Sequence, residues 1–152
     1  MTTQDSTLAL LTAGYRSDPQ AFLAKPLLLR WWVHGGEPGS PSDVLTIEGS
    51  AGKFEAIYRR VRYDFSRSPP QQVDEARRPM PTDAVMQLLD NMFGALFRQR
   101  LPEEDGHDLA DARQEQWDLQ QGARGLTKVF HEPFPTSLGP LRERFVNSVR
   151  GR

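Results

Sequence analysis

Short-range alternation of apolar and polar residues, broken by a glycine-rich stretch, predicts a β-hairpin over residues 43–63. Residues 44–47 are apolar or β-branched, residues 49–52 supply the turn, and residues 53–63 continue as a longer strand. The alternation divides this longer strand between two faces, with Phe54, Ala56 and Tyr58 on one and Glu55, Ile57 and Arg59 on the other. The hairpin therefore predicts a sheet against which helices can pack.

Two other segments have strand patterns. Residues 27–34 carry apolar side chains on both alternating faces, which is typical of a central or well-covered strand. Trp31 and Trp32 are adjacent there, and adjacent strand residues point to opposite faces. One indole can therefore enter the core, while the other must be covered by a helix, by residues 1–25 or by a partner. Residues 116–120 and 125–131 predict a second hairpin.

Helical periodicity is clearest over residues 81–101, where apolar residues recur every three or four positions up to Pro102. Gly94 lies inside this helix, and we expect it to allow close packing on the sheet. Residues 6–15 and 19–24 predict two short helices. A closing helix is predicted after Thr136 or Ser137, with one apolar stripe formed by Leu138, Leu141, Phe145 and Val149.

The order α-β-β-β-α-β-β-α predicts an α+β fold. We expect a two-layer sandwich, with an antiparallel sheet of about five strands packed under helices. The length of 152 residues predicts a single domain spanning 1–152. Residues 1–5 and 151–152 are expected to fray, and the polar, proline-interrupted segments 66–80 and 102–114 are expected to be long loops.

Composition removes several classes of function. The chain has no cysteine, which excludes disulfides, thiolate metal sites and cysteine nucleophiles. A net charge of −1 gives no overall attraction to nucleic acid. No apolar run approaches the roughly 20 residues of a membrane span, and the first residues lack the basic region of a signal peptide. We therefore expect a soluble, cytoplasmic protein that does not associate with membranes.

The sequence contains no recognisable catalytic or metal-binding constellation. The three histidines are isolated, and the acidic run 103–111 lacks the spacing of a calcium loop. The segment 49–53 is too short for a phosphate loop and precedes a strand. We predict no catalytic residue, no metal and no cofactor. The alternative is an enzyme or small-ligand binder with a pocket between sheet and helices, using His34, His131, Arg30 or Glu55.

Basic and aromatic residues mark a candidate protein-binding surface. The run 58–63 interleaves tyrosine with arginine, and the tryptophan pair lies on a neighbouring strand. The candidate residues are Trp31, Trp32, Tyr58, Arg60, Arg62 and Tyr63. A plainer interpretation is an exposed strand whose arginine stems cover apolar surface. A further alternative is single-stranded nucleic-acid binding through residues 59–67. If Trp31 or Trp32 anchors a second copy, the protein forms a homodimer.

Several segments together resemble the emfourin family of small bacterial inhibitors of thermolysin-type metalloproteases. They are the strand and glycine turn over residues 47–56, the Met80-Pro81-Thr82 start of a long helix, the hairpin over residues 117–130, and a closing helix with Leu138, Leu141 and Phe145. The first 43 residues and the segments 66–80 and 102–114 have no counterpart in that family. The resemblance assigns no inhibitory residue.

The element order also resembles class I type III secretion chaperones, which are dimers that wrap an extended effector segment. Both resemblances imply a protein that acts by binding another protein. From the sequence we therefore expect a non-enzymatic protein-binding module, acting as a small inhibitor, an immunity-like protein or a chaperone.

Overall fold

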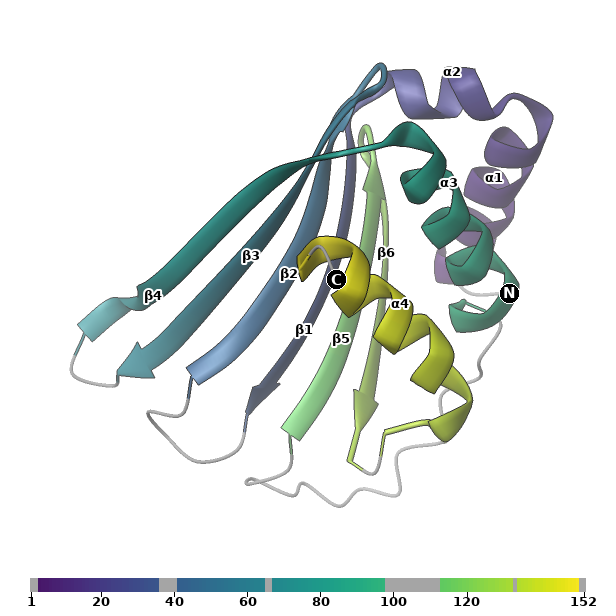
Figure 1. Cartoon of the computed structure of the whole chain (residues 1–152). Helices are drawn as coiled ribbons and strands as arrows, with labels where there is room; N and C mark the ends of the chain where they lie inside the picture. The colour runs from purple at the N-terminus through teal and green to yellow at the C-terminus, as the bar shows by residue number, and fades with distance from the viewer. Residues whose placement is uncertain (1–2, 36–40, 65–66, 98–112, 133, 151–152) are drawn as a thin grey trace.

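A computed structural model describes residues 3–35, 41–64, 67–97, 113–132 and 134–150. It has an α+β fold in which the helices gather on one face of an antiparallel sheet (Figure 1). The helical elements are α1 (Thr3–Ser17), α2 (Pro19–Ala24), α3 (Thr82–Asn91), the π-helical turn η1 (Met92–Leu96), the 3-10 turn η2 (Thr136–Leu138) and α4 (Gly139–Arg150). Among the described residues, no helix is both long and apolar enough to cross a bilayer.

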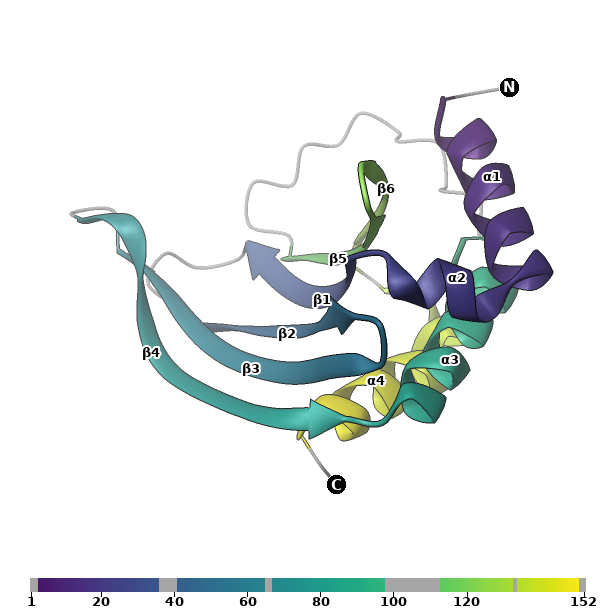
Figure 2. The same ribbon diagram turned by 90° about the horizontal axis from the view of Figure 1, so that it is seen from above.

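The sheet has six strands in the order β4-β3-β2-β1-β5-β6, and all neighbours are antiparallel. The strands are β1 (Leu27–Gly35), β2 (Pro41–Ser50), β3 (Lys53–Asp64), β4 (Arg67–Met80), β5 (Arg113–Gln121) and β6 (Arg124–His131). Strand β1 is central, as its apolar residues on both faces predicted. Seen from above, the sheet curves and its helices lie together on one side (Figure 2).

The hairpin of β2 and β3 has the predicted turn. Ala51 and Gly52 have positive φ angles of 52° and 82°, as a two-residue primed turn requires. The turn sets a register in which Ser50 pairs with Lys53 and Asp43 pairs with Arg60. The predicted alternation along β3 is confirmed.

The prediction of a long loop over residues 66–80 is wrong. Arg67–Met80 forms β4, which pairs with β3, and the sheet therefore has six strands instead of about five. This strand is at the edge of the sheet, where solvent reaches the side chains of residues 74–79 and apolar alternation is not needed. Proline is also tolerated at an edge because no second neighbour needs its missing N–H. Both features hide an edge strand from pattern analysis.

Helix boundaries also differ from those predicted. Helix α1 begins at Thr3, so the expected fraying of residues 1–5 is wrong for the part that the structure describes. Leu11 and Tyr15 of α1 are buried, and this packing holds the helix. The predicted helix over 81–101 is α3 continued by η1. Residues 98–112 and 151–152 lie outside the described residues, and 113–114, predicted to be in a loop, belong to β5.

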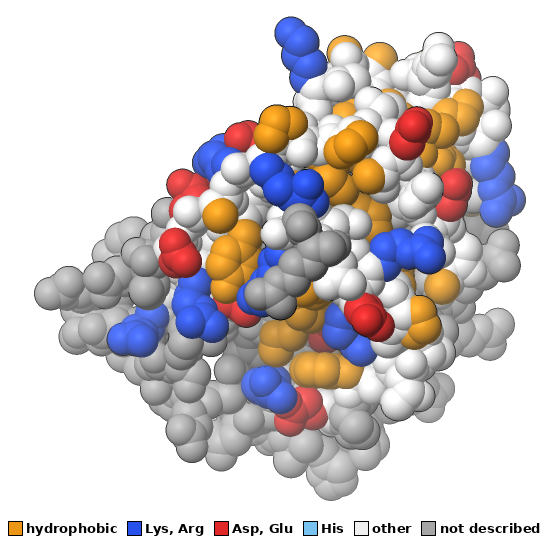
Figure 3. All heavy atoms as spheres, in the orientation of Figure 1, with side chains coloured by type: hydrophobic (Ala, Val, Ile, Leu, Met, Phe, Trp, Pro, Cys, Tyr) orange, Lys and Arg blue, Asp and Glu red, His pale blue; other side chains and the backbone are white. Residues whose placement is uncertain are grey.

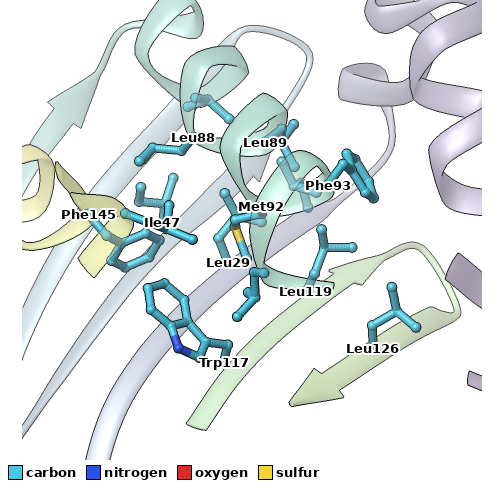
Figure 4. Packing of buried hydrophobic residues seen from close by; sticks show 14 of the residues in the cluster. Leu29, Ile47, Leu88, Leu89, Met92, Phe93, Trp117, Leu119, Leu126 and Phe145 are labelled. Atoms are coloured by element: carbon cyan, nitrogen blue, oxygen red, sulfur yellow. The ribbon is translucent and has the colours of Figure 1, made fainter. Parts of the chain in front are cut away.

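The core fills the space between the helices and the inner face of the sheet, which we define as the face toward the helices (Figure 4). Leu29 of β1, Ile47 of β2 and Leu119 of β5 are fully buried on the sheet side of this core. Leu88 and Leu89 of α3 and Met92 of η1 are fully buried on the helix side. Trp117 and Phe145 extend the core under α4, with ring centroids 5.6 Å apart and ring planes at 80°. Such edge-to-face pairs add about 1 kcal/mol to simple burial.

Candidate functional site

Polar residues meet on the inner face where α4 ends over β3. The turn register places Asp43 of β2 opposite Arg60, and Tyr58 lies two residues away on the same face of β3. The Tyr58 hydroxyl donates to Asp43 Oδ1 at 2.8 Å, and Arg60 Nε donates to the same oxygen at 3.2 Å. Arg150, at the end of α4, donates to Asp43 Oδ2 at 3.2 Å. One carboxylate thus joins two strands to the last helix.

The ring of Tyr58 is covered by the same arginine. The guanidinium carbon of Arg150 lies 4.7 Å from the ring centroid, and Arg150 Nη2 lies 3.2 Å from the tyrosine oxygen. Burial, and then the hydrogen bond to Asp43, raises the pKa of Tyr58 above its ordinary value. The hydrogen bond and charge of Asp43 raise the pKa of Arg60. At neutral pH Tyr58 is therefore a hydrogen-bond donor, and the guanidinium of Arg150 covers its ring.

An open groove of about 430 Å³ lies beside this cluster. Its lining residues are Tyr58, Arg60, Ala76, Arg77, Arg78, Val149 and Arg150. We call it the arginine groove. Figure 3 shows basic side chains spread over this side of the molecule, around the end of α4, with a few carboxylates among them.

The arginines of the groove differ in how far their charge is neutralised. Arg77 is paired with Glu55 and Glu75, at 3.2 and 3.0 Å. Arg78 Nε donates to the backbone oxygen of Val149 at 3.2 Å, and within the described part of the chain Arg78 forms no ion pair. Its guanidinium is therefore anchored to the end of α4 while its charge stays available.

The structure separates the six residues predicted to bind protein. Tyr58 and Arg60 lie together in the groove, and Arg62 follows on the same face of β3, where it is exposed. Trp31 shares this inner face, but it packs against the core and Trp117. Trp32 is half-buried on the opposite, outer face of the sheet. Tyr63 belongs to β3, but its side chain is not among those that the structure describes.

A buried carboxylate explains the position of Trp31. Glu115 of β5 is fully buried and accepts the indole N–H groups of Trp31 and Trp117, both at 3.1 Å. Arg142 of α4 donates to both of its oxygens. Because every hydrogen bond stays within the fold, this cluster ties β1, β5 and α4 together as a structural element. The sequence gives no signal for this cluster, because Glu115 precedes the strand predicted over residues 116–120 and has the pattern of an ordinary polar residue.

The outer face of the sheet, opposite the helices, is covered by its own charged side chains. Arg30 donates to Asp118 at 2.8 Å, and Arg59 donates to Glu75 at 3.0 Å. The hydrogen bonds of Arg59 and Arg77 lower the pKa of Glu75. Beneath these long side chains Ile57 is fully buried, although it faces away from the helices. Arg77 lies opposite Ile57 in the β3–β4 register and Arg59 lies two residues along the same face, so their stems are placed to cover this apolar side chain.

The alternative of a pocket between sheet and helices finds no support in the described residues. Apolar side chains fill that space, while Arg30 and Glu55 lie on the outer face. His131 is exposed, and the side chain of His34 is not among those that the structure describes. A second open groove, of about 510 Å³, lies at the far end of the outer face and mixes Glu48 with basic and amide groups. Within the described residues, no three histidines or carboxylates gather as metal ligands do.

Of the residues that surround Tyr58 and Arg60, Asp43 could be placed from the sequence, whereas Arg78 and Arg150 could not. The two-residue turn makes the numbers of paired residues constant in sum, which places Asp43 opposite Arg60. Arg78 and Arg150 reach the groove only through β4 and the docking of α4, and neither leaves a signal in the local pattern.

Comparison of the chain with protein-family models and with curated proteins finds no match.

Proposed function

We propose that this protein is a non-enzymatic protein-binding module, of the inhibitor, immunity-like or chaperone kind, and that its partner binds at the arginine groove. The observation that carries the proposal is the convergence of Arg60, Arg78 and Arg150 around one open hollow. Arginine and tyrosine are enriched where proteins recognise one another, because both combine a broad apolar surface with hydrogen-bond donors.

The chemistry of the lining supports binding over catalysis. The groove offers guanidinium donors, one phenol and small apolar groups, and none of the described residues that line it is a carboxylate or a histidine. Histidine is the commonest general base, and the phenol of the groove, Tyr58, already donates its hydroxyl hydrogen to Asp43. Asp43 is adjacent but accepts hydrogen bonds from Tyr58, Arg60 and Arg150.

Apolar docking has less support than polar recognition. Among the described residues, Leu10 is the large hydrophobic residue that stands out as exposed, at 53%. An apolar interface would need a patch of several hundred Å². We therefore assign recognition to the charged groove. Self-association through a tryptophan stays a prediction, and of the two, Trp32 on the outer face is the one outside the core.

Strand addition at the free edge of β4 is also disfavoured. Pro79 lacks an N–H, Arg77 and Arg78 place charge on the strand, and the pairing with β3 is irregular after Arg60. Natural edge strands use such features to prevent pairing with other chains. The proposed contact therefore depends on side chains and not on a backbone ladder.

The test is co-purification with the tagged full chain, followed by mass spectrometry. The wild type is compared with the double variant Arg60→Gln/Arg78→Gln and with the control Arg124→Gln/Arg144→Gln, whose exposed arginines lie on β6 and α4. We expect a protein that the wild type and the control retain and the groove variant loses. Retention by all three chains would place the interface elsewhere, and no retained protein would contradict a protein-binding function.

A further inference from the structure

We infer that the partner presents an acidic segment in extended conformation, with carboxylates at alternate positions, and that Arg60, Arg62 and Arg78 bind those carboxylates. This inference rests on the proposed function and specifies what the arginine groove recognises.

The first step is the charge that the fold leaves unbalanced. Asp43 contacts Arg60 and Arg150, and Asp74 lies opposite Arg60 in the β3–β4 register. The backbone oxygens at the end of α4 add about half a negative charge. Against these stand Arg60, Arg62, Arg78 and Arg150, so within the described residues the groove, together with Arg62 beside it on β3, keeps an excess of positive charge.

The second step is the geometry of Arg78. Its Nε is held by Val149, while its terminal nitrogens form no hydrogen bond with the rest of the described chain. A guanidinium has donors in a planar fork that matches the two oxygens of a carboxylate. Since the stem is half-buried and the head is already anchored, little side-chain freedom is lost on binding.

The third step is the spacing along β3. Arg60 and Arg62 lie on the same face, because they pair with Asp43 and Pro41 of β2. Residues two apart on a strand are separated by about 7 Å. An extended peptide repeats its side chains on one side at the same interval, so acidic residues at alternate positions match this row of arginines. Arg62 is exposed and forms no ion pair within the described residues, which leaves it available.

The same observations argue against nucleic acid. Binding of single strands depends on aromatic rings on which bases stack, and the ring of Tyr58 is already covered by Arg150. Asp43 and Asp74 would also repel a continuous row of phosphates. Isolated carboxylates can avoid these acidic positions, whereas a phosphate backbone cannot.

The test is fluorescence anisotropy of labelled peptides with the full chain. The probes are an alternating Glu-Ser peptide, a Gln-Ser peptide of equal length, oligouridylate and inorganic pyrophosphate. We expect the Glu-Ser peptide to bind, its affinity to fall with rising salt, and Arg78→Gln or Arg60→Gln to weaken it about tenfold. Arg124→Gln removes an exposed arginine on β6 and should leave the affinity unchanged.

Arg62→Gln separates a loss of binding from a loss of folding, because this exposed arginine has no ion pair within the described residues. It should weaken binding of the Glu-Ser peptide while the melting temperature stays constant. Equal binding of the Gln-Ser peptide, tighter binding of oligouridylate or pyrophosphate, or no effect of any groove variant would overturn the inference. If a co-purified partner is retained regardless of salt and of these peptides, the inference of an acidic segment is overturned. The proposed protein-binding function would still hold in that case. Peptide binding without any protein partner would overturn the proposed function instead.

Discussion

Glu115 of β5 and Arg142 of α4 form a bidentate ion pair inside the protein, with Arg142 Nη2 lying 3.0 Å from Glu115 Oε1. The glutamate is fully buried, and the indole N–H groups of Trp31 and Trp117 complete its hydrogen bonding. A buried charge is tolerated only when its partners remain in place. This pair therefore fixes the docking of α4, and with it the position of Arg150 in the arginine groove.

Loss of the arginine partner should be costly. Arg142→Met leaves a buried carboxylate without its counter-charge, and we expect the free energy of unfolding to fall by about 3 kcal/mol in urea denaturation. The matched control is Arg144→Met, an exposed position on the same helix, which should change stability by less than about 0.5 kcal/mol. Glu115→Leu/Arg142→Met should recover part of the loss. Equal stability of the two single variants would contradict a structural role for the pair.

Ile57 should behave as a core residue although it faces away from the helices. Its side chain is fully buried beneath the arginines of the outer face, so Ile57→Ala should lower the free energy of unfolding by about 2–5 kcal/mol. Val129→Ala, at a half-buried position of the same face, is the control and should cost less. If thermal denaturation gives the two variants the same small shift, the arginine stems do not shield Ile57.

Two glycine substitutions should have opposite signs. Gly49 has φ of +149°, and a Cβ there would lie 2.0 Å from the backbone oxygen of Lys53, so Gly49→Ala should destabilise the hairpin. A Cβ at Gly94 would meet nothing within 4 Å. The expectation that Gly94 permits close packing is thus wrong, and Gly94→Ala should raise stability by about 0.5–1 kcal/mol. Melting temperatures that shift in the same direction would contradict these environments.

Stability should decline in alkaline solution because of Tyr15. Burial, and then its interaction with Asp90, raises the pKa of Tyr15 far above its ordinary value of 10.0. Above pH 10.0 the unfolded chain loses this proton while the folded chain keeps it, so the free energy of unfolding falls as pH rises. Tyr15→Phe should be less stable at neutral pH, having lost the bond to Met86, but should lose less on going to alkaline pH. Parallel pH profiles for the two proteins would contradict the raised pKa.

The sequence pattern predicted the structure correctly where the conformation depends on residues close together in the chain. The turn at Ala51 and Gly52 needs positive φ, and the register that brings Asp43 to Arg60 follows from it. The strand β4 escaped detection because an edge strand exposed to solvent needs no alternation. Arg78 and Arg150 are more than 70 residues apart, and their meeting depends on tertiary packing that no window of sequence contains. Tyr58, Arg60 and Arg62 could therefore be named from the sequence, whereas Arg78 and Arg150 could not.

Binding of a partner's acidic segment at the arginine groove can be observed residue by residue. Backbone amide chemical shifts of the isotope-labelled full chain, followed during titration with the alternating Glu-Ser peptide, test it most directly. We expect saturable shifts concentrated at Ala76, Arg78 and Val149 and along β3 at Arg60 and Arg62, with smaller shifts at higher salt. Shifts confined to β6 or to the outer face around Trp32, or no shifts at saturating peptide, would contradict it.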